Sequence, residues 1–166
     1  MINDDTTARI VSLEKRVAIL EHEREILNTL YRYAHAIDYG DEVAWVDCFV
    51  ESGIFDVRLT PVTDPAAERM IYVVGHSALA EFIRQHPRAP NVLHKHLLLN
   101  PRIDLNGSTA GVQSYFELLL ERNRERQIFC FGRYLDELSL CDDGRWRFTL
   151  RRAEVQSTSL AGLPSH

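Results

Sequence analysis

Asp38 is a charged side chain at the end of an otherwise apolar pattern. It follows Leu27, Tyr31 and Ala34 at intervals of eleven, seven and four residues, and these intervals align on one face of a helix that turns by about 100° per residue. A buried carboxylate is costly unless it is paired, so the pattern indicates either a functional residue or a partner for it. A plainer interpretation, in which Asp38 only belongs to the helix end, stays open.

Two histidines stand at alternate positions in residues 93–99, which read Leu-His-Lys-His-Leu-Leu-Leu. In a strand, His94 and His96 would point to the same face. One imidazole on a concave surface suits proton transfer because it titrates near neutral pH, and two of them could share a metal ion. No third ligand stands at a recognisable spacing, so we predict acid–base chemistry with no metal and no cofactor. The remaining histidines, including His86, are predicted to be solvated or structural.

Tyr33 is a candidate hydrogen-bond donor. It shares a second helical stripe with Ile26, Leu30 and Ile37, so it should face inward. Its hydroxyl could donate to a substrate oxygen, and an ordinary core tyrosine fits the same pattern equally well.

Arg152 is a candidate anchor for an oxyanion or a carboxylate. Strict alternation along the last expected strand places it on the face of Trp146, Phe148 and Leu150. Arg152 would then reach the open end of the fold, and Arg151 would point outward. An arginine at the rim in a surface ion pair is the alternative.

The apolar spacing predicts the elements that hold these residues. A helix is expected over residues 7–39, ending at Gly40, a short one from Asp41 as N-cap through an apolar run to Phe49, and a third from Gly75 to Pro87. Strands are expected over residues 54–59, 71–74, 93–105, 108–122, 126–140 and 145–156, with Gly53 turning the chain into the first of them and with hairpin turns at Asn106-Gly107 and Asp143-Gly144.

Helices followed by strands are typical of α+β proteins. We therefore predict a cone-shaped α+β barrel in which a curved, mostly antiparallel sheet wraps around three helices from the N-terminal half. Such a cone has an apolar interior with one open end, which is the usual form of a small-molecule site.

The composition bounds the class of protein. The 166 residues are 45% hydrophobic and 26% charged, with a formal net charge of −5, as in an ordinary globular domain. The acidic balance disfavours nucleic acid, and no apolar run approaches the roughly 20 residues that cross a bilayer. The three widely spaced cysteines form no CxxC pair. Because the N-terminus is acidic and unlike a signal peptide, we predict a cytoplasmic protein.

One domain is expected over residues 1–166, with residues 1–24 as a charged helical extension and residues 157–166 as a C-terminal tail. The extension carries a narrow seam, Ile10, Leu13, Val17 and Leu20, which either packs on a partner subunit or projects from the domain. We expect a homo-oligomer, either a dimer or a trimer.

The sequence over residues 13–156 resembles the SnoaL-like branch of the nuclear transport factor two-like superfamily. The pieces that carry the resemblance are Arg32-Tyr33-Ala34-His35-Ala36-Ile37-Asp38, Gly75-His76-Ser77-Ala78-Leu79, His96 ahead of Pro101-Arg102-Ile103, Gly132-Arg133-Tyr134 and Asp143-Gly144-Arg145-Trp146-Arg147. Polyketide cyclases, scytalone dehydratase, bile acid 7α-dehydratase and a dehydrochlorinase are members of this superfamily.

The resemblance implies roles for particular residues. In the lyase members, an aspartate at the end of the first helix and a histidine on the facing strand look like a base dyad, which here corresponds to Asp38 and His96. The dehydratase also has a tyrosine five residues before that aspartate, matching Tyr33. Its second acidic residue and its C-terminal arginine fall on Leu118 and Val155, where this chain departs from the pattern.

The resemblance therefore implies a cofactor-independent lyase of the dehydratase type, or an isomerase, acting on a small hydrophobic cyclic substrate. We assign substrate binding to Arg152, His94, Trp45 and Tyr134. The fold also hosts non-catalytic relatives, so the alternative is a ligand-binding module or an assembly subunit like the small subunit of a ring-hydroxylating dioxygenase.

Overall fold

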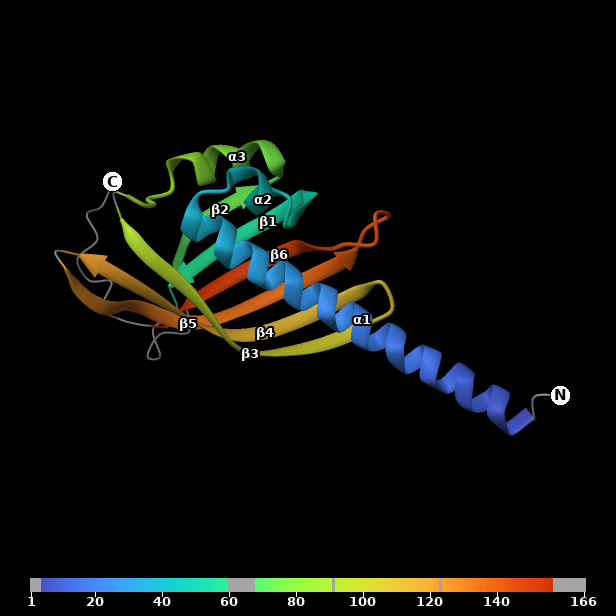
Figure 1. The fold of residues 1–166 in the computed structure, drawn as a ribbon. Helices are drawn as coiled ribbons and strands as arrows, with labels where there is room; N and C mark the ends of the chain where they lie inside the picture. The colour runs from blue at the N-terminus through green and yellow to red at the C-terminus, as the bar shows by residue number, and fades with distance from the viewer. Residues whose placement is uncertain (1–3, 60–67, 91, 123, 157–166) are drawn as a thin grey trace.

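The computed structural model describes residues 4–59, 68–90, 92–122 and 124–156 (Figure 1). Over these ranges the chain forms three helices, α1 (Asp4–Tyr39), α2 (Glu42–Val46) and α3 (His76–Gln85). Gly40 ends α1 in the left-handed conformation (φ 76°). The carboxylate of Asp41 then caps α2 by accepting from the backbone N–H of Ala44 at 3.0 Å, as the sequence predicted. The predicted tail, residues 157–166, lies outside the described residues.

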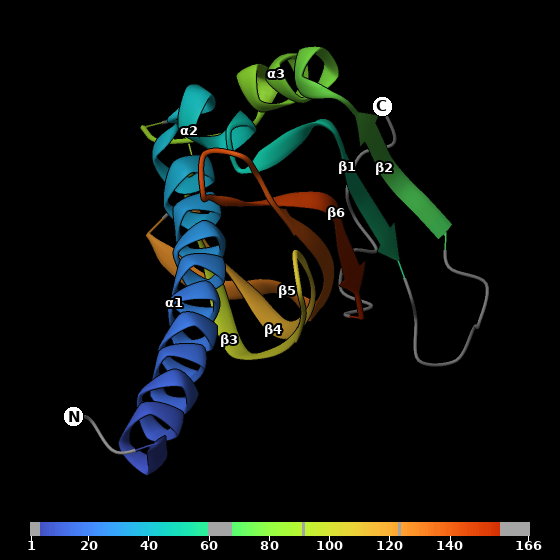
Figure 2. The same ribbon diagram turned by 90° about the vertical axis from the view of Figure 1, so that its right-hand side faces the viewer.

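The strands form one curved sheet beneath α1 (Figure 2). They are β1 (Phe49–Leu59), β2 (Glu68–Val74), β3 (Leu93–Asn106), β4 (Thr109–Arg122), β5 (Glu125–Leu140) and β6 (Trp146–Val155). Their order is β2-β1-β6-β5-β4-β3, and each neighbouring pair is antiparallel except β1 and β6. The predicted α+β class is confirmed, and the described strands leave the sheet unclosed between β2 and β3.

The prediction for residues 49–53 was wrong. Phe49 begins β1 instead of extending the second helix, and Gly53 lies inside the strand. The pairing of β1 with β6 shifts register between Phe49 and Ile54, which marks a bend in the strand. A Cβ at Gly53 would lie 2.8 Å from the Cβ of Phe49. Glycine therefore permits a close approach inside a strand here and does not mark its start.

The predicted alternation of β6 was also wrong at its two arginines. The pairing of β6 with β5 shifts between Phe148 and Leu150, as expected for a β-bulge at Thr149. Because one extra residue exchanges the two faces of a strand, Arg151 turns inward and is 1% exposed. Arg152 turns to the outer face of the sheet.

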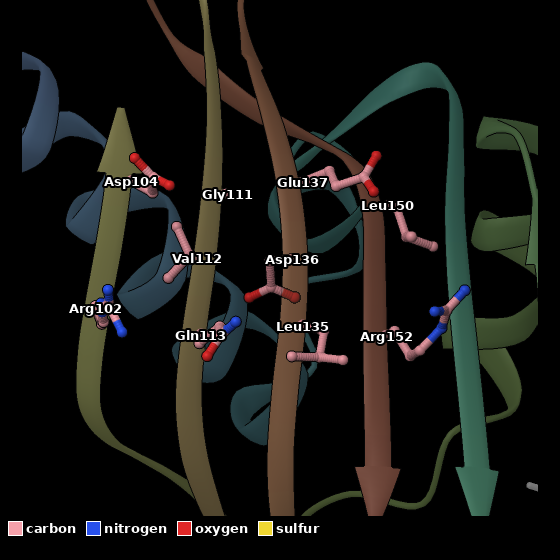
Figure 3. Close-up of a pocket in the computed structure, with 10 residues that line it drawn as sticks. All are labelled: Arg102, Asp104, Gly111, Val112, Gln113, Leu135, Asp136, Glu137, Leu150 and Arg152. Atoms are coloured by element: carbon pink, nitrogen blue, oxygen red, sulfur yellow. The ribbon is translucent and has the colours of Figure 1, made fainter. Parts of the chain in front are cut away.

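The outer face of the sheet, which points away from the helices, carries a polar depression of about 380 Å³ (Figure 3). Arg152 lines this depression together with Arg102, Asp104 and Glu137. Its Nε lies 3.0 Å from the Oδ2 of Asp56, so the guanidinium is held by an ion pair on the side of the sheet opposite the helices.

The helix α1 has two parts with different surroundings. Residues 4–21 are exposed and project from the domain (Figure 1), whereas the part from Ile26 onward packs on the sheet. None of the helices in the described part of the chain is long and apolar enough to cross a membrane.

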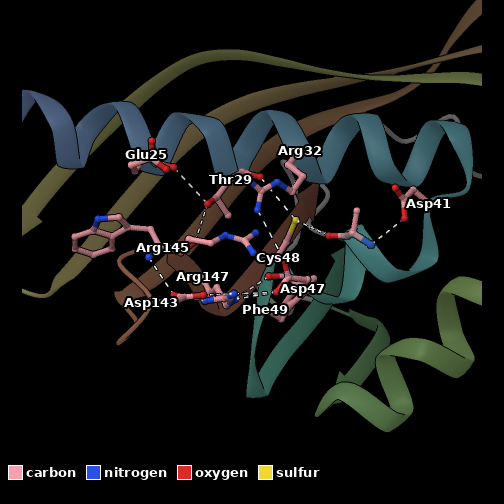
Figure 4. Close-up of polar contacts among 12 residues, drawn as sticks. Glu25, Thr29, Arg32, Asp41, Asp47, Cys48, Phe49, Asp143, Arg145 and Arg147 are labelled. Carbon is pink, nitrogen blue, oxygen red and sulfur yellow. Dashed lines mark hydrogen bonds and ion pairs between the residues drawn. The ribbon is translucent and has the colours of Figure 1, made fainter.

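A buried hydrogen bond fixes the packed part of α1 to the sheet. The hydroxyl of Thr29 donates to the carbonyl of Trp146 at 2.6 Å, and Thr29 is 4% exposed. Figure 4 shows Thr29 beside the side chains that join α1 and α2 to the start of β1. The contact ties the helix that carries Tyr33 and Asp38 to β6, the strand that carries Arg151.

We predict that Thr29→Val lowers the free energy of unfolding by about 1–2 kcal/mol, because the carbonyl of Trp146 would stay buried without a donor. Urea denaturation followed by circular dichroism measures this change. Thr109→Val is the matched control, since its hydroxyl donates to the carbonyl of Asn106 in an exposed turn, and it should cost less than about 0.5 kcal/mol. Equal losses in the two variants would contradict the anchoring role.

Candidate active site

A cavity of about 540 Å³ lies between the packed part of α1, α3 and the inner face of the sheet. Its lining is mostly apolar, as predicted for the interior of the cone. The described residues that line it are Tyr33, Ile37, Phe55, Val57, Met70, Ile71, Phe82, Gln85, His86, Pro87, His96, Phe116, Leu118, Phe129, Cys130, Tyr134, Ala153 and Val155. The size and apolar character suit a small hydrophobic ligand held by a few polar groups.

Asp38 and His96 meet beside this cavity. The Nδ1 of His96 lies 2.7 Å from the Oδ1 of Asp38, and the backbone N–H of His96 also reaches both carboxylate oxygens at 3.2 Å. Asp38 is 6% exposed at the end of α1, so the carboxylate gains the donors that its burial requires. The structure therefore brings together the two residues proposed as a dyad.

The orientation of the histidine decides its chemistry. An ionised Asp38 accepts hydrogen bonds only, so the Nδ1 of His96 must carry the proton between them. In the neutral imidazole, Nε2 is then the atom with the free lone pair. Because the ring lines the cavity, it is suited to take a proton from a bound molecule.

His86 is a residue of this cavity that the sequence analysis did not assign. It lies just beyond α3 and lines the cavity, with its ring centroid 6.1 Å from that of His96. Burial, together with the nearby His96 and His94, lowers the pKa of His86 to about 4. The ring is therefore neutral near pH 7 and adds no positive charge next to the dyad.

A buried cation holds the two tyrosines of the cavity. The guanidinium carbon of Arg151 lies 4.0 Å from the ring centroid of Tyr33 and 3.7 Å from that of Tyr134, within the range of cation–π attraction. Its Nη1 pairs with the Oδ2 of Asp136 at 2.9 Å. Burial raises the pKa of Tyr33 and of Tyr134, so both phenols stay protonated and can donate hydrogen bonds.

The site of Arg151 was not predictable from the sequence pattern, because it depends on the bulge at Thr149. A run of alternating residues carries no marker of where a strand gains one extra residue. Arg152, the predicted substrate anchor, does not line the cavity. Its guanidinium lies on the outer face of the sheet, where it pairs with Asp56.

The other predicted substrate-binding residues have different locations. Tyr134 lines the cavity. Trp45 is fully buried and supports the wall from behind, with its ring centroid 5.6 Å from that of Tyr33. His94 is also absent from the described lining and lies behind the dyad, with its Nε2 3.6 Å from the Oδ1 of Asp38.

Leu118 and Val155, the two departures from the dehydratase pattern, both line the cavity. They give apolar surface where the resemblance would place a carboxylate and an arginine. The polar side chains among the described residues that line the cavity are those of Tyr33, Gln85, His86, His96, Cys130 and Tyr134.

An open, curved sheet over helices with a polar group in an apolar cavity defines the nuclear transport factor two-like class. Within it, the chain belongs to the SnoaL-like domain family, whose model matches residues 18–152. A search of curated proteins finds no match.

Solved structures with the same fold have diverse descriptions. One, assigned as the beta subunit of an aromatic-ring-hydroxylating dioxygenase of Novosphingobium aromaticivorans, has a TM-score of 0.71 and 20% identity over 90% of this chain and 99% of that chain. An NTF2-like protein with a cystatin-like fold from the same organism has a TM-score of 0.72 and 19% identity, covering 97% and 95%. A Catenulispora acidiphila protein in complex with S-DNPA has a TM-score of 0.63 and 22% identity, covering 84% and 97%. At these identities the likeness shows the fold.

The buried pair of Arg151 and Asp136 predicts a pH dependence of stability. Burial raises the pKa of Asp136 to about 7, whereas an aspartate in an unfolded chain titrates near about 3.9. The folded state thus holds a proton that the unfolded chain has lost between these values. The stability contributed by that proton is present near pH 4 and is lost as the pH rises through 7.

We predict that, between pH 4 and pH 7, the wild-type free energy of unfolding falls by at least about 1 kcal/mol relative to that of Asp136→Asn, which is neutral throughout. Denaturant unfolding at several pH values measures the difference. Asp142→Asn, at an exposed position, is the control and should show no comparable trend. A pH-independent difference for Asp136→Asn would contradict the proposed protonation.

Proposed function

We propose that this protein is a cofactor-independent lyase of the dehydratase type, or an isomerase, that acts on a small hydrophobic cyclic substrate. The observation that carries the proposal is the 2.7 Å contact between Asp38 and the Nδ1 of His96 in a ring that lines an apolar cavity. Dehydration and isomerisation both begin with removal of a proton, and this arrangement provides a base for that step.

His96 acts as the general base through its Nε2. Asp38 holds the ring in the required tautomer and stabilises the imidazolium that forms when the proton is taken. The aspartate of a Ser-His-Asp triad has the same effect on its histidine. The backbone N–H of His96 fixes the same carboxylate, so the pair is preorganised before the substrate enters.

Tyr33 donates to the oxygen on which negative charge develops, either a leaving hydroxyl or an enolate oxygen. Its phenol is a donor because burial keeps it protonated, and a donor at such an oxygen is worth a few kcal/mol in the transition state. Tyr134 and the apolar residues around it hold the ring of the substrate and exclude water, which strengthens both contacts.

The alternative is a non-catalytic subunit or ligand carrier, and one solved structure with this fold is assigned as a dioxygenase subunit. The dyad favours catalysis, because a carrier of hydrophobic molecules has no need of a carboxylate–imidazole pair in its wall. Two observations distinguish these functions. A subunit co-purifies with a large partner chain, whereas an enzyme turns over its substrate without one.

We predict that His96→Ala and Asp38→Asn each lower kcat by about 10²- to 10⁴-fold, the range typical of positioned acid–base groups. A panel of cyclic alcohols and ketones, followed for loss of water or migration of a double bond, supplies the assay. His35→Ala removes an exposed imidazole from the same helix and should keep wild-type activity. Wild-type turnover in both variants would contradict the catalytic role of Asp38 and His96, provided that circular dichroism shows both variants folded.

We also propose that copies of the chain associate through the projecting part of α1. Its seam of Ile10, Leu13, Val17 and Leu20 repeats at intervals of three and four residues, as in a coiled coil. These side chains are 44–62% exposed in the single chain, which leaves apolar area available for a second copy.

We expect Leu13→Glu combined with Leu20→Glu to convert an oligomer to a monomer, because four or more charges would meet in the seam. Light scattering coupled to size-exclusion chromatography measures the mass. Ile19→Glu is the control, since Ile19 is 48% exposed but points away from the seam. A monomeric wild type, or an unchanged mass in the double variant, would refute this interface.

A further inference from the structure

His94 is a buried histidine, 7% exposed. Its buried Nε2 has no hydrogen-bond partner among the residues that the structure describes. The ring forms a hydrogen bond with the backbone of Ile37 that favours the protonated ring, so the acceptor is the carbonyl and the donor must be Nδ1. A histidine whose Nδ1 carries the proton has only a lone pair at Nε2.

That lone pair faces another acceptor. The Nε2 of His94 lies 3.6 Å from the Oδ1 of Asp38, which is too long for a hydrogen bond between them. Both atoms are acceptors, and although the Oδ1 of Asp38 accepts from His96, the buried Nε2 of His94 has no donor among the described residues. A cation between the two atoms would give this nitrogen a partner.

We propose that Asp38, His94 and His96 form a binding site for a divalent transition-metal ion of the Zn²⁺ or Co²⁺ type. One ligand atom from each of the three residues lies within 4.8 Å of the other two. Ligands of a tetrahedral zinc ion, with bonds of about 2.0–2.1 Å, are about 3.3 Å apart. The contacts of 2.7 Å and 3.6 Å to the Oδ1 of Asp38 bracket that value, so small shifts admit an ion.

The surroundings of the three ligands support this assignment. Histidines that bind metals usually donate their other N–H to a backbone carbonyl or a carboxylate, as His94 does toward Ile37. Two imidazoles and one carboxylate leave a fourth position for water or another ligand. The Nζ of Lys95 lies 3.8 Å from the other oxygen of Asp38, and its side chain is 47% exposed, so it can move toward solvent when an ion enters.

No metal was predicted from the sequence, because no third ligand stands at a recognisable spacing from His94 and His96. The third ligand comes from the end of α1, which packs against β3 and is 58 residues away from His96 in the sequence. Such a ligand set forms only through the fold.

The ion and the hydrogen-bonded dyad exclude each other. An ion bound at the Nδ1 of His96 replaces the proton shared with Asp38, and the neutral ring then carries its proton on Nε2, where it can no longer act as a base. We therefore expect the metal to inhibit the proposed lyase or isomerase activity. The binding itself does not rest on that activity.

The test is metal binding by the full-length, untagged chain. Titration calorimetry with Zn²⁺ should show one equivalent per chain, and Co²⁺ should give the visible absorption of a low-coordinate site. His94→Ala should weaken the binding of both ions by at least about tenfold, and His94→Gln should do the same while keeping the size of the side chain. His35→Ala, at an exposed position, should bind as the wild type does.

Three outcomes would overturn the proposal: no binding by the wild type in the micromolar range, equal binding by the wild type and both His94 variants, or equal loss in His35→Ala. Circular dichroism of each variant shows whether it is folded. Binding without any catalytic activity would support the metal site and count against the proposed enzyme, so the two hypotheses can fail separately.

Discussion

A carboxylate buried at the end of α1 has to be paired, and the pairing of Asp38 governs how the helix meets the sheet. Within the described part of the chain its partners come from β3: the backbone N–H and Nδ1 of His96 and the amino group of Lys95. An unpaired carboxylate in this place would cost several kcal/mol. The stability of the docked helix and the orientation of the proposed base therefore depend on the same contacts, so a change that loosens one loosens the other.

A second buried charge lies behind the wall of the cavity, against the rings of Tyr33 and Tyr134. Arg151 and Asp136 are 1% and 3% exposed, and the guanidinium packs on the rings of Tyr33 and Tyr134. This arrangement gives the phenols fixed positions and a nearby positive charge, which favours donation to an oxygen that becomes negative. Apolar surface separates this site from His96, so the proposed base and the proposed donor, Tyr33, lie on different parts of the cavity wall, as the proposed proton abstraction with charge stabilisation requires.

The elements were predictable because their signals are local. The stripe of Ile26, Leu30, Tyr33 and Ile37, the cap at Asp41 and the two Gly-containing hairpin turns depend on neighbouring residues in the sequence, and the structure has them where the sequence placed them. The other predicted stripe is only partly confirmed, because Tyr31 is 43% exposed. The meeting of Asp38 with His96 is not local, and only the family resemblance pointed to it. His86 had no local signal at all, since its place in the cavity depends on how α3 lies over β1 and β2.

Arg151 shows why the alternation of side chains along β6 did not predict which arginine turns inward. A single extra residue at Thr149 exchanges the faces of β6 for the rest of its length, and nothing in the identity of the residues reports it. The exchange nevertheless has a physical reason: an inward Arg151 finds the carboxylate of Asp136, and an outward Arg152 finds that of Asp56. In the bulged register each face of the sheet pairs one arginine of β6 with one buried aspartate, Arg151 with Asp136 and Arg152 with Asp56. Without the bulge the two arginines would exchange faces, so the extra residue at Thr149 decides which arginine packs on the tyrosines of the cavity.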